Sequence, residues 1–210
     1  MLIALRSIAL AMALASIWVG RADAVPIEYR MWGVVTGSLG AENFYDAGLT
    51  FSLQGDTDAA FAWTNAYSNG WESFVRPGAI TGSTVTIEGL GTALTGAMMV
   101  IANPNDFCRC IGLARWTTGG PSVMDLRQTE FTLANPYDLR SSTGIISGQP
   151  VWWPGNYVNT SRGELRISYG SDVHFQATLV PVPSAALMLG PVLALLPALR
   201  RRGAGEERSP

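Results

Sequence analysis

Alternation of polar and apolar side chains is clearest near the end of the chain. Residues 164–169 alternate between the two kinds, and so do residues 173–177. A period of two is typical of a β-strand with one face toward a core and the other toward solvent. Gly170, Ser171 and Asp172, which lie between the two runs, are residue types that favour a tight turn. The pattern therefore predicts that the two runs pair as a β-hairpin.

Short segments rich in β-branched and aromatic residues recur through the middle of the chain. Almost no stretch of 12 residues there lacks a Gly or Pro, which argues against long helices. Together with the two runs above, about ten strands at this spacing predict an all-β domain, an antiparallel β-sandwich or jelly roll. An outer-membrane β-barrel is the rival fold, but it needs longer paired strands and aromatic girdles. The further strand segments are 27–36, 49–53, 60–63, 73–75, 83–88, 97–101, 111–116 and 130–133.

The N-terminal residues have the pattern of a secretory signal peptide. Arg6 precedes an apolar stretch over residues 7–20, and Ala22 and Ala24 place small side chains at positions −3 and −1 before Val25. We therefore predict a signal peptide over residues 1–24, cleaved between Ala24 and Val25. An uncleaved anchor is the alternative, although 14 apolar residues rise only about 21 Å as a helix, less than the roughly 30 Å hydrocarbon core.

A second apolar segment, residues 185–199, lies near the C-terminus and ends in a cluster of arginines. Its 15 residues span only about 22 Å as a helix and include two prolines, so it is short for a stable membrane anchor. By the positive-inside rule the arginines stay in the cytoplasm, as Arg6 does. Both ends thus predict that everything between them lies on the far side of the membrane. The cluster consists of Arg200, Arg201 and Arg202.

The C-terminal segment resembles the PEP-CTERM sorting signal of Gram-negative bacteria that carry an exosortase. Such a signal has a Val-Pro-x-Pro box, a short apolar helix and an Arg-rich end. Two features depart from the family pattern: Val182 replaces the usual Glu between the prolines, and residues 203–210 extend past the arginines as a tail that we expect to be disordered. The box and the residue after it are Val180, Pro181, Val182, Pro183 and Ser184.

The resemblance covers only this tail, with the signal peptide as its expected companion. It implies processing by signal peptidase and an exosortase, a transient contact with the inner membrane, and delivery to the cell surface or the extracellular matrix, with exopolysaccharide as a partner. An ordinary C-terminal anchor, or a hydrophobic strand that ends in a basic tail, is the alternative. The predicted organisation is a signal peptide at 1–24, a secreted β-rich domain at 25–179, a sorting signal at 180–202 and a disordered tail at 203–210.

The 155 residues of the predicted domain are enough for one core that buries about two-thirds of the chain's surface. The domain holds eight Arg, 13 acidic residues and no Lys, so its net charge is −5. This balance disfavours nucleic acid as a partner. The absence of Lys from the chain also excludes a Walker-type phosphate loop and a lysine Schiff base.

His174 is the only histidine, so any Ser-His-Asp or Cys-His catalytic device would have to use it. Its alternation with Val173 and Phe175 favours a position on a sheet face instead of a catalytic role. We expect no catalytic residues, no cofactor and no metal site. A secreted glycosidase that uses two carboxylates is the enzymatic alternative, because such acids can lie far apart in sequence.

Cys108 and Cys110 are the only cysteines, in a chain that we expect to reach an oxidising compartment. Two residues at i and i+2 of a strand lie about 7 Å apart, at the limit for a disulfide, so a bond between them requires a turn at Arg109. We favour a structural disulfide. Free thiols and ligands for a soft metal are the alternatives.

Two loops carry side chains that could bind a ligand. Asp56 and Asp58 are a fragment of a calcium loop, but the following residues lack its other ligands, so a solvated turn is the preferred interpretation. Trp152, Trp153 and Tyr157 gather around a Pro-Gly break, where exposed rings could stack on sugars, although core packing is the simpler interpretation. The sequence thus predicts a non-enzymatic surface or matrix protein, with a carbohydrate-binding module as the alternative.

Overall fold

The computed structural model describes residues 24–64, 71–75, 80–104, 109–115, 122–127, 137–151 and 157–181. This part contains thirteen β-strands and one short 3-10 helix, η2 (Thr57–Ala59). The prediction of an all-β domain built from antiparallel strands is confirmed. The strands are β1 (Pro26–Leu39), β2 (Glu42–Asp56), β3 (Ala60–Thr64), β4 (Trp71–Val75), β5 (Thr81–Ile87), β6 (Gly91–Leu94), β7 (Met98–Asn103), β8 (Cys110–Arg115), β9 (Ser122–Arg127), β10 (Ile146–Ser147), β11 (Gln149–Val151), β12 (Tyr157–Thr160) and β13 (Gly163–Leu179).

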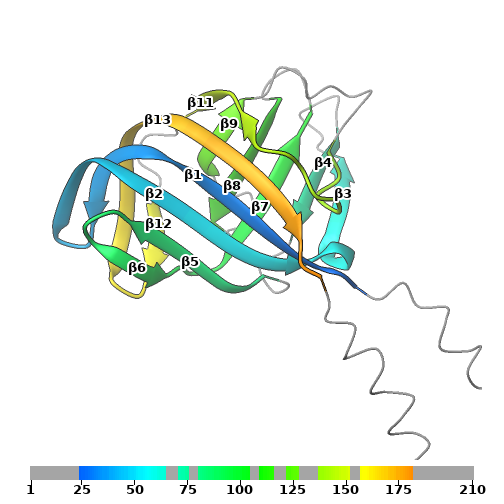
Figure 1. Cartoon of the computed structure of the whole chain (residues 1–210), viewed down its shortest axis with the longest axis horizontal. Coiled ribbons are helices and arrows are strands. Elements are labelled where there is room, and N and C mark those ends of the chain that lie inside the picture. Colours follow the sequence, from blue (N-terminus) through cyan, green and yellow to red (C-terminus); the bar gives the residue numbers. More distant parts are fainter. Residues whose placement is uncertain are drawn as a thin grey trace, which may run out of the picture.

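The strands form two sheets (Figure 1). The larger sheet has the order β10-β13-β1-β2-β5-β6, and β12 also pairs with β13. The smaller sheet has the order β11-β9-β8-β7-β4-β3. The strands β1, β2 and β13 are 14, 15 and 17 residues long and lie side by side, so they are the frame of the larger sheet. The predicted strand over residues 130–133 lies outside the described residues.

One buried cluster draws side chains from both sheets. The larger sheet contributes residues such as Tyr29, Phe51 and Phe175, and the smaller sheet contributes residues such as Ile111 and Leu126. In β1, β2 and β13 the buried side chains occupy mostly alternate positions, because successive residues of a strand point to opposite faces. Burial of this apolar surface stabilises the fold at about 25 cal/mol per Å².

A segment without strand structure, residues 137–145, adds to the same cluster. Leu139 is fully buried although its φ angle is +64°, and its carbonyl accepts a hydrogen bond of 2.6 Å from the hydroxyl of Tyr29. Farther along, the Oγ1 of Thr143 accepts a 2.9 Å hydrogen bond from the N–H of Ala177 in β13. The segment is therefore fixed to the core at one end and to β13 at the other.

The hairpin predicted from residues 164–177 is wrong, because β13 runs without reversal through the whole region. Asp172 adopts a φ angle of +51°, and the pairing with β1 changes register there: Trp32 lies opposite His174, whereas Val34 lies opposite Ser171. This is a β-bulge, which bends a strand without ending it. β13 continues as one strand because β1 pairs with it on both sides of the bulge. Gly33 fits beside it, since a Cβ there would lie 3.0 Å from the carbonyl oxygen of Ser171.

The outer edge of β6 is joined to the β12–β13 turn. Thr95 and Thr160 form an isolated antiparallel bridge, and the N–H of Gly96 donates a 2.6 Å hydrogen bond to the carbonyl of Asn159. Arg162, in the same turn, donates to the carbonyl of Leu90 and forms a 2.7 Å ion pair with Glu42. These contacts cover an edge that would otherwise present unpaired backbone groups.

Within the described residues, no helix has the length and apolar character needed to cross a membrane. The apolar segments predicted at 7–20 and 185–199 lie outside those residues.

Candidate functional site

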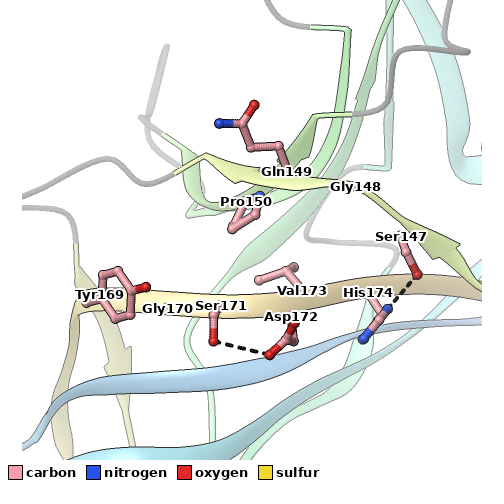
Figure 2. A pocket seen from close by; sticks show the side chains of 10 residues that line it. All are labelled: Ser147, Gly148, Gln149, Pro150, Tyr169, Gly170, Ser171, Asp172, Val173 and His174. Atoms are coloured by element: carbon pink, nitrogen blue, oxygen red, sulfur yellow. Dashed lines mark hydrogen bonds between the residues drawn. The ribbon is translucent and has the colours of Figure 1, made fainter.

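An open groove of about 540 Å³ lies between the two sheets, along β13 (Figure 2). Residues 147–150 form one side, and they include the last residue of β10 and the first two residues of β11. Residues 169–174 of β13 form the other side. Its position follows from strand pairing: among the described strands, β12 pairs with β13 up to Arg166, and β10 pairs with it from His174 onward. The groove lies between these two pairings.

Two irregularities in β13 determine which side chains face the groove. In addition to the bulge at Asp172, the pairing with β1 shifts between Thr36 and Gly37, which lie opposite Tyr169 and Ile167. The shift changes which residues of β13 point toward the core and which point toward solvent. Leu165 and Ile167 are buried, but Tyr169, the next apolar residue of the pattern, is 60% exposed. The alternation alone would have placed this ring in the core.

Tyr169 stands at one end of the groove, and Ser147 and His174 stand at the other (Figure 2). Pro150 points from β11 toward β13 between them. Asp172 is exposed on the other side of β13 at the rim, where its carboxylate accepts a 3.4 Å hydrogen bond from the hydroxyl of Ser171. Asp is among the few residues other than Gly that tolerate a positive φ, which explains its place at the bulge.

His174 is half-buried on the face of β13, as the alternation predicted. Its Nδ1 lies 2.6 Å from the Oγ of Ser147, and its ring centroid lies 5.4 Å from that of Trp32 on β1. A Ser-His-Asp device requires a carboxylate that orients the imidazole. Within the described residues, no hydrogen bond joins His174 to a carboxylate. The Ser147–His174 contact instead ties β10 to β13 at the end of the groove.

The acidic loop at residues 56–58 folds as a helix cap. Asp56 is the N-cap of η2, and its Oδ1 accepts a 3.0 Å hydrogen bond from the N–H of Asp58. Such a side chain satisfies a backbone donor that the helix itself leaves free. The described residues contain no group of three or more His, Cys, Asp or Glu side chains that could hold a metal ion.

Cys110, the first residue of β8, is buried and disulfide-bonded. The chain has one other cysteine, Cys108, which lies outside the described residues. Arg109 has a φ angle of +47°. This left-handed conformation supplies the turn that a bridge across a single residue requires.

The ring of Tyr157 already has two cationic neighbours. The guanidinium carbon of Arg115 lies 4.2 Å from the ring centroid, and that of Arg166 lies 5.1 Å away. Glu164 in turn binds Arg166 at 2.6 Å. Because Arg115 belongs to β8 and Tyr157 to β12, the contact between Arg115 and Tyr157 connects the two sheets. Trp152 and Trp153, the other two members of the predicted aromatic cluster, lie outside the described residues.

The two ends of the described chain lie next to each other. Ile27 pairs with Leu179, and the N–H of Val180 donates a 2.8 Å hydrogen bond to the carbonyl of Pro26. Of the residues in the two predicted processing signals, the structure describes Ala24, Val25, Val180 and Pro181. The others lie outside the described residues, namely Ala22, Val182, Pro183, Ser184, Arg200, Arg201 and Arg202.

Comparisons with protein-family models, with curated proteins and with solved structures found no match for this chain. Sequence reasoning missed the groove, because its two sides come from separate segments and its exposed tyrosine occupies an apolar position of the pattern. The one available signal was the Gly-Ser-Asp sequence at residues 170–172, which suits a bulge as well as a turn.

Proposed function

We propose that this chain is an exported, non-enzymatic β-sandwich protein that signal peptidase and an exosortase process for delivery to the cell surface or exopolysaccharide matrix of a Gram-negative bacterium. The observation that carries the proposal is that the folded domain begins and ends where the two predicted processing signals meet it. The first strand begins at Pro26, one residue after the predicted signal-peptidase site. The last strand ends at Leu179, directly before the Val-Pro-x-Pro box that begins at Val180.

The sandwich architecture is supported by a core that the two sheets share. Two antiparallel sheets contribute to one buried cluster, which is the arrangement expected when two sheets pack face to face about 10 Å apart. Among the described residues, the buried members of the cluster run from Ile27 to Ala177, and Leu179 packs against them. All of these residues lie between the two predicted cleavage sites.

The position of the ends suits attachment to a membrane. Figure 1 shows that β1 begins and β13 ends at the same corner of the molecule. Segments that leave the body there can both reach one membrane surface without crossing the domain. The prolines of the box keep the chain extended and poor in backbone donors, which suits a segment presented to a protease.

The test follows the chain in an exosortase-carrying host and in the same host without exosortase. We expect an intact mass that begins at Val25 and ends between Pro181 and Ser184 in the first host, and a product that keeps its tail in the second. Deletion of residues 184–210 should leave the protein in the periplasm, whereas deletion of residues 203–210 alone should not change sorting. Surface protein that still contains Leu199, or normal surface levels of the longer deletion, would refute the proposal.

A further inference from the structure

We infer that the groove between β11 and β13 binds an uncharged oligosaccharide, with Tyr169 as the stacking platform. This inference goes beyond the proposed sorting function, because it concerns what the folded body recognises and does not depend on how the chain is exported. It rests on the shape of the groove, on the side chains that line it, on its charge and on the backbone of β13.

The shape of the groove suits part of a longer chain molecule. Its volume of about 540 Å³ falls within the range of roughly 300–1,000 Å³ that is usual for ligand sites. The groove is open to solvent instead of enclosed, so a segment of a chain molecule can enter it from the side. It is framed by strands of two different sheets, which hold its sides apart without a ligand.

The lining provides the two kinds of contact that a sugar ring needs. Tyr169 offers an aromatic face for the C–H groups of a pyranose ring, and it is 60% exposed although it lies within a strand. Hydroxyl groups of a sugar need partners that both donate and accept, and the far end of the groove offers the hydroxyl of Ser147 and the imidazole of His174.

The charge of the groove selects against acidic ligands. Asp172 is the one acidic residue among the lining residues that the structure describes, and they include no arginine. The chain has no lysine, and residues 25–179 carry a net charge of −5. A phosphate or a uronic acid would therefore meet the like charge of Asp172, with no arginine among the described lining residues to bind it. An uncharged saccharide does not meet this barrier.

The backbone of β13 argues against the main rival, a peptide that adds to the sheet as a strand. Strand addition needs a regular edge with evenly spaced hydrogen-bonding groups. β13 has a register shift between Ile167 and Tyr169, at one end of the groove, and a bulge at Asp172 within it, and bulges are a device that blunts edges against pairing.

The experiment measures binding by isothermal titration calorimetry with the full-length chain in a detergent that has no sugar headgroup. The neutral probes are cellohexaose, laminarihexaose, maltohexaose and mannohexaose, the acidic probe is hexagalacturonate, and an alternating Val-Thr hexapeptide tests strand addition. Tyr169→Ala should weaken binding of the preferred neutral probe at least tenfold. Tyr45→Ala is the matched control, because Tyr45 is 75% exposed on β2 and does not line the groove.

The inference stands if at least one neutral hexasaccharide binds, Tyr169→Ala loses that binding, Tyr45→Ala keeps it, and both variants keep the thermal midpoint of the parent chain. It is overturned if none of the neutral probes binds, if hexagalacturonate or the peptide binds more tightly than they do, or if Tyr45→Ala weakens binding as much as Tyr169→Ala.

A second variant, Asp172→Asn, tests the charge of the ligand. Asn also tolerates positive φ, so this variant should retain binding within about threefold. A loss tenfold or greater would indicate that the ligand needs the negative charge and would likewise overturn the uncharged assignment.

Discussion

Replacing Tyr29 by Phe removes one hydroxyl from the centre of the molecule and leaves the rest of the ring in place. That hydroxyl donates a 2.6 Å hydrogen bond to the carbonyl of Leu139, and both residues are fully buried. Tyr137 offers a matched control, because its hydroxyl also donates to a carbonyl, that of Ser141, at 2.5 Å, but the contact is exposed. Both rings also contact that of Phe175, with centroid distances of 6.4 Å and 6.5 Å.

The expected magnitudes differ because water can reach only one of the two carbonyls. In Tyr29→Phe the carbonyl of Leu139 loses its side-chain donor inside the core, which costs about 1–3 kcal/mol. In Tyr137→Phe the carbonyl of Ser141 can bind water instead, so we expect a loss below about 1 kcal/mol. In a domain of this size, about 2 kcal/mol corresponds to a fall in Tm of about 4–8 °C.

Urea unfolding followed by tryptophan fluorescence measures both variants against the parent protein at one pH. The slope of the transition should stay constant, since neither change alters the surface exposed on unfolding. Equal losses in the two variants would refute the reasoning, because the argument depends on the difference in burial. A Tyr29→Phe variant as stable as the parent would show that Leu139 is not held by this bond.

Three further predictions concern the turns and the pH. In urea unfolding, Gly163→Ala should destabilise the protein more than Gly89→Ala. Both glycines have positive φ, so both substitutions strain the backbone. Only at Gly163 would the added Cβ also crowd a neighbour, since it would lie 2.9 Å from the Cα of Gly40, whereas nothing lies within 4 Å of a Cβ at Gly89. Arg162→Gln should lower the free energy of unfolding by about 1 kcal/mol, and by more than Arg166→Gln does. The reason is that Arg162 joins separate turns, whereas Arg166 forms its ion pair with Glu164 of its own strand. Equal midpoints of thermal unfolding in the two variants would contradict this. Burial, and then the nearby carboxylates of Asp138 and Asp56, raises the pKa of Tyr29, so the stability it contributes is complete below the unfolded pKa of about 10 and is lost as the pH rises beyond it. Urea midpoints at about pH 9 and pH 11 should therefore fall less in Tyr29→Phe than in the parent.

The sequence was sufficient for the fold class but not for the connections within it. Alternation identified residues 164–169 and 173–177 as strand, and both lie in β13. It could not decide whether Gly170, Ser171 and Asp172 reverse the chain, because the same residue types form turns and bulges. The decision depends on β1, which pairs with β13 on both sides of the bulge and lies more than 130 residues away in the sequence. Strands as short as β10 and β11, of two and three residues, have no visible period.

The groove was even less accessible to sequence reasoning. Exposure of Tyr169 depends on a register shift opposite Gly37, which is a property of the strand pair and not of either strand. The contact between Ser147 and His174 joins residues 27 positions apart through a strand of only two residues. By contrast, the position of His174 on a sheet face was predictable, since it needs only the local alternation with its neighbours.

The pairing of the first strand with the last also determines how the body would respond to tension. Pro26 and Val180 are hydrogen-bonded at the same end of an antiparallel pair, so a force that pulls the two termini apart acts across the ladder and loads its hydrogen bonds one after another. Such an unzipping geometry yields at lower force than a sheared one, in which many bonds share the load. If both termini of the domain were anchored, the β1–β13 pair would thus separate at low force. If only one terminus is anchored, no tension passes through this pair of strands.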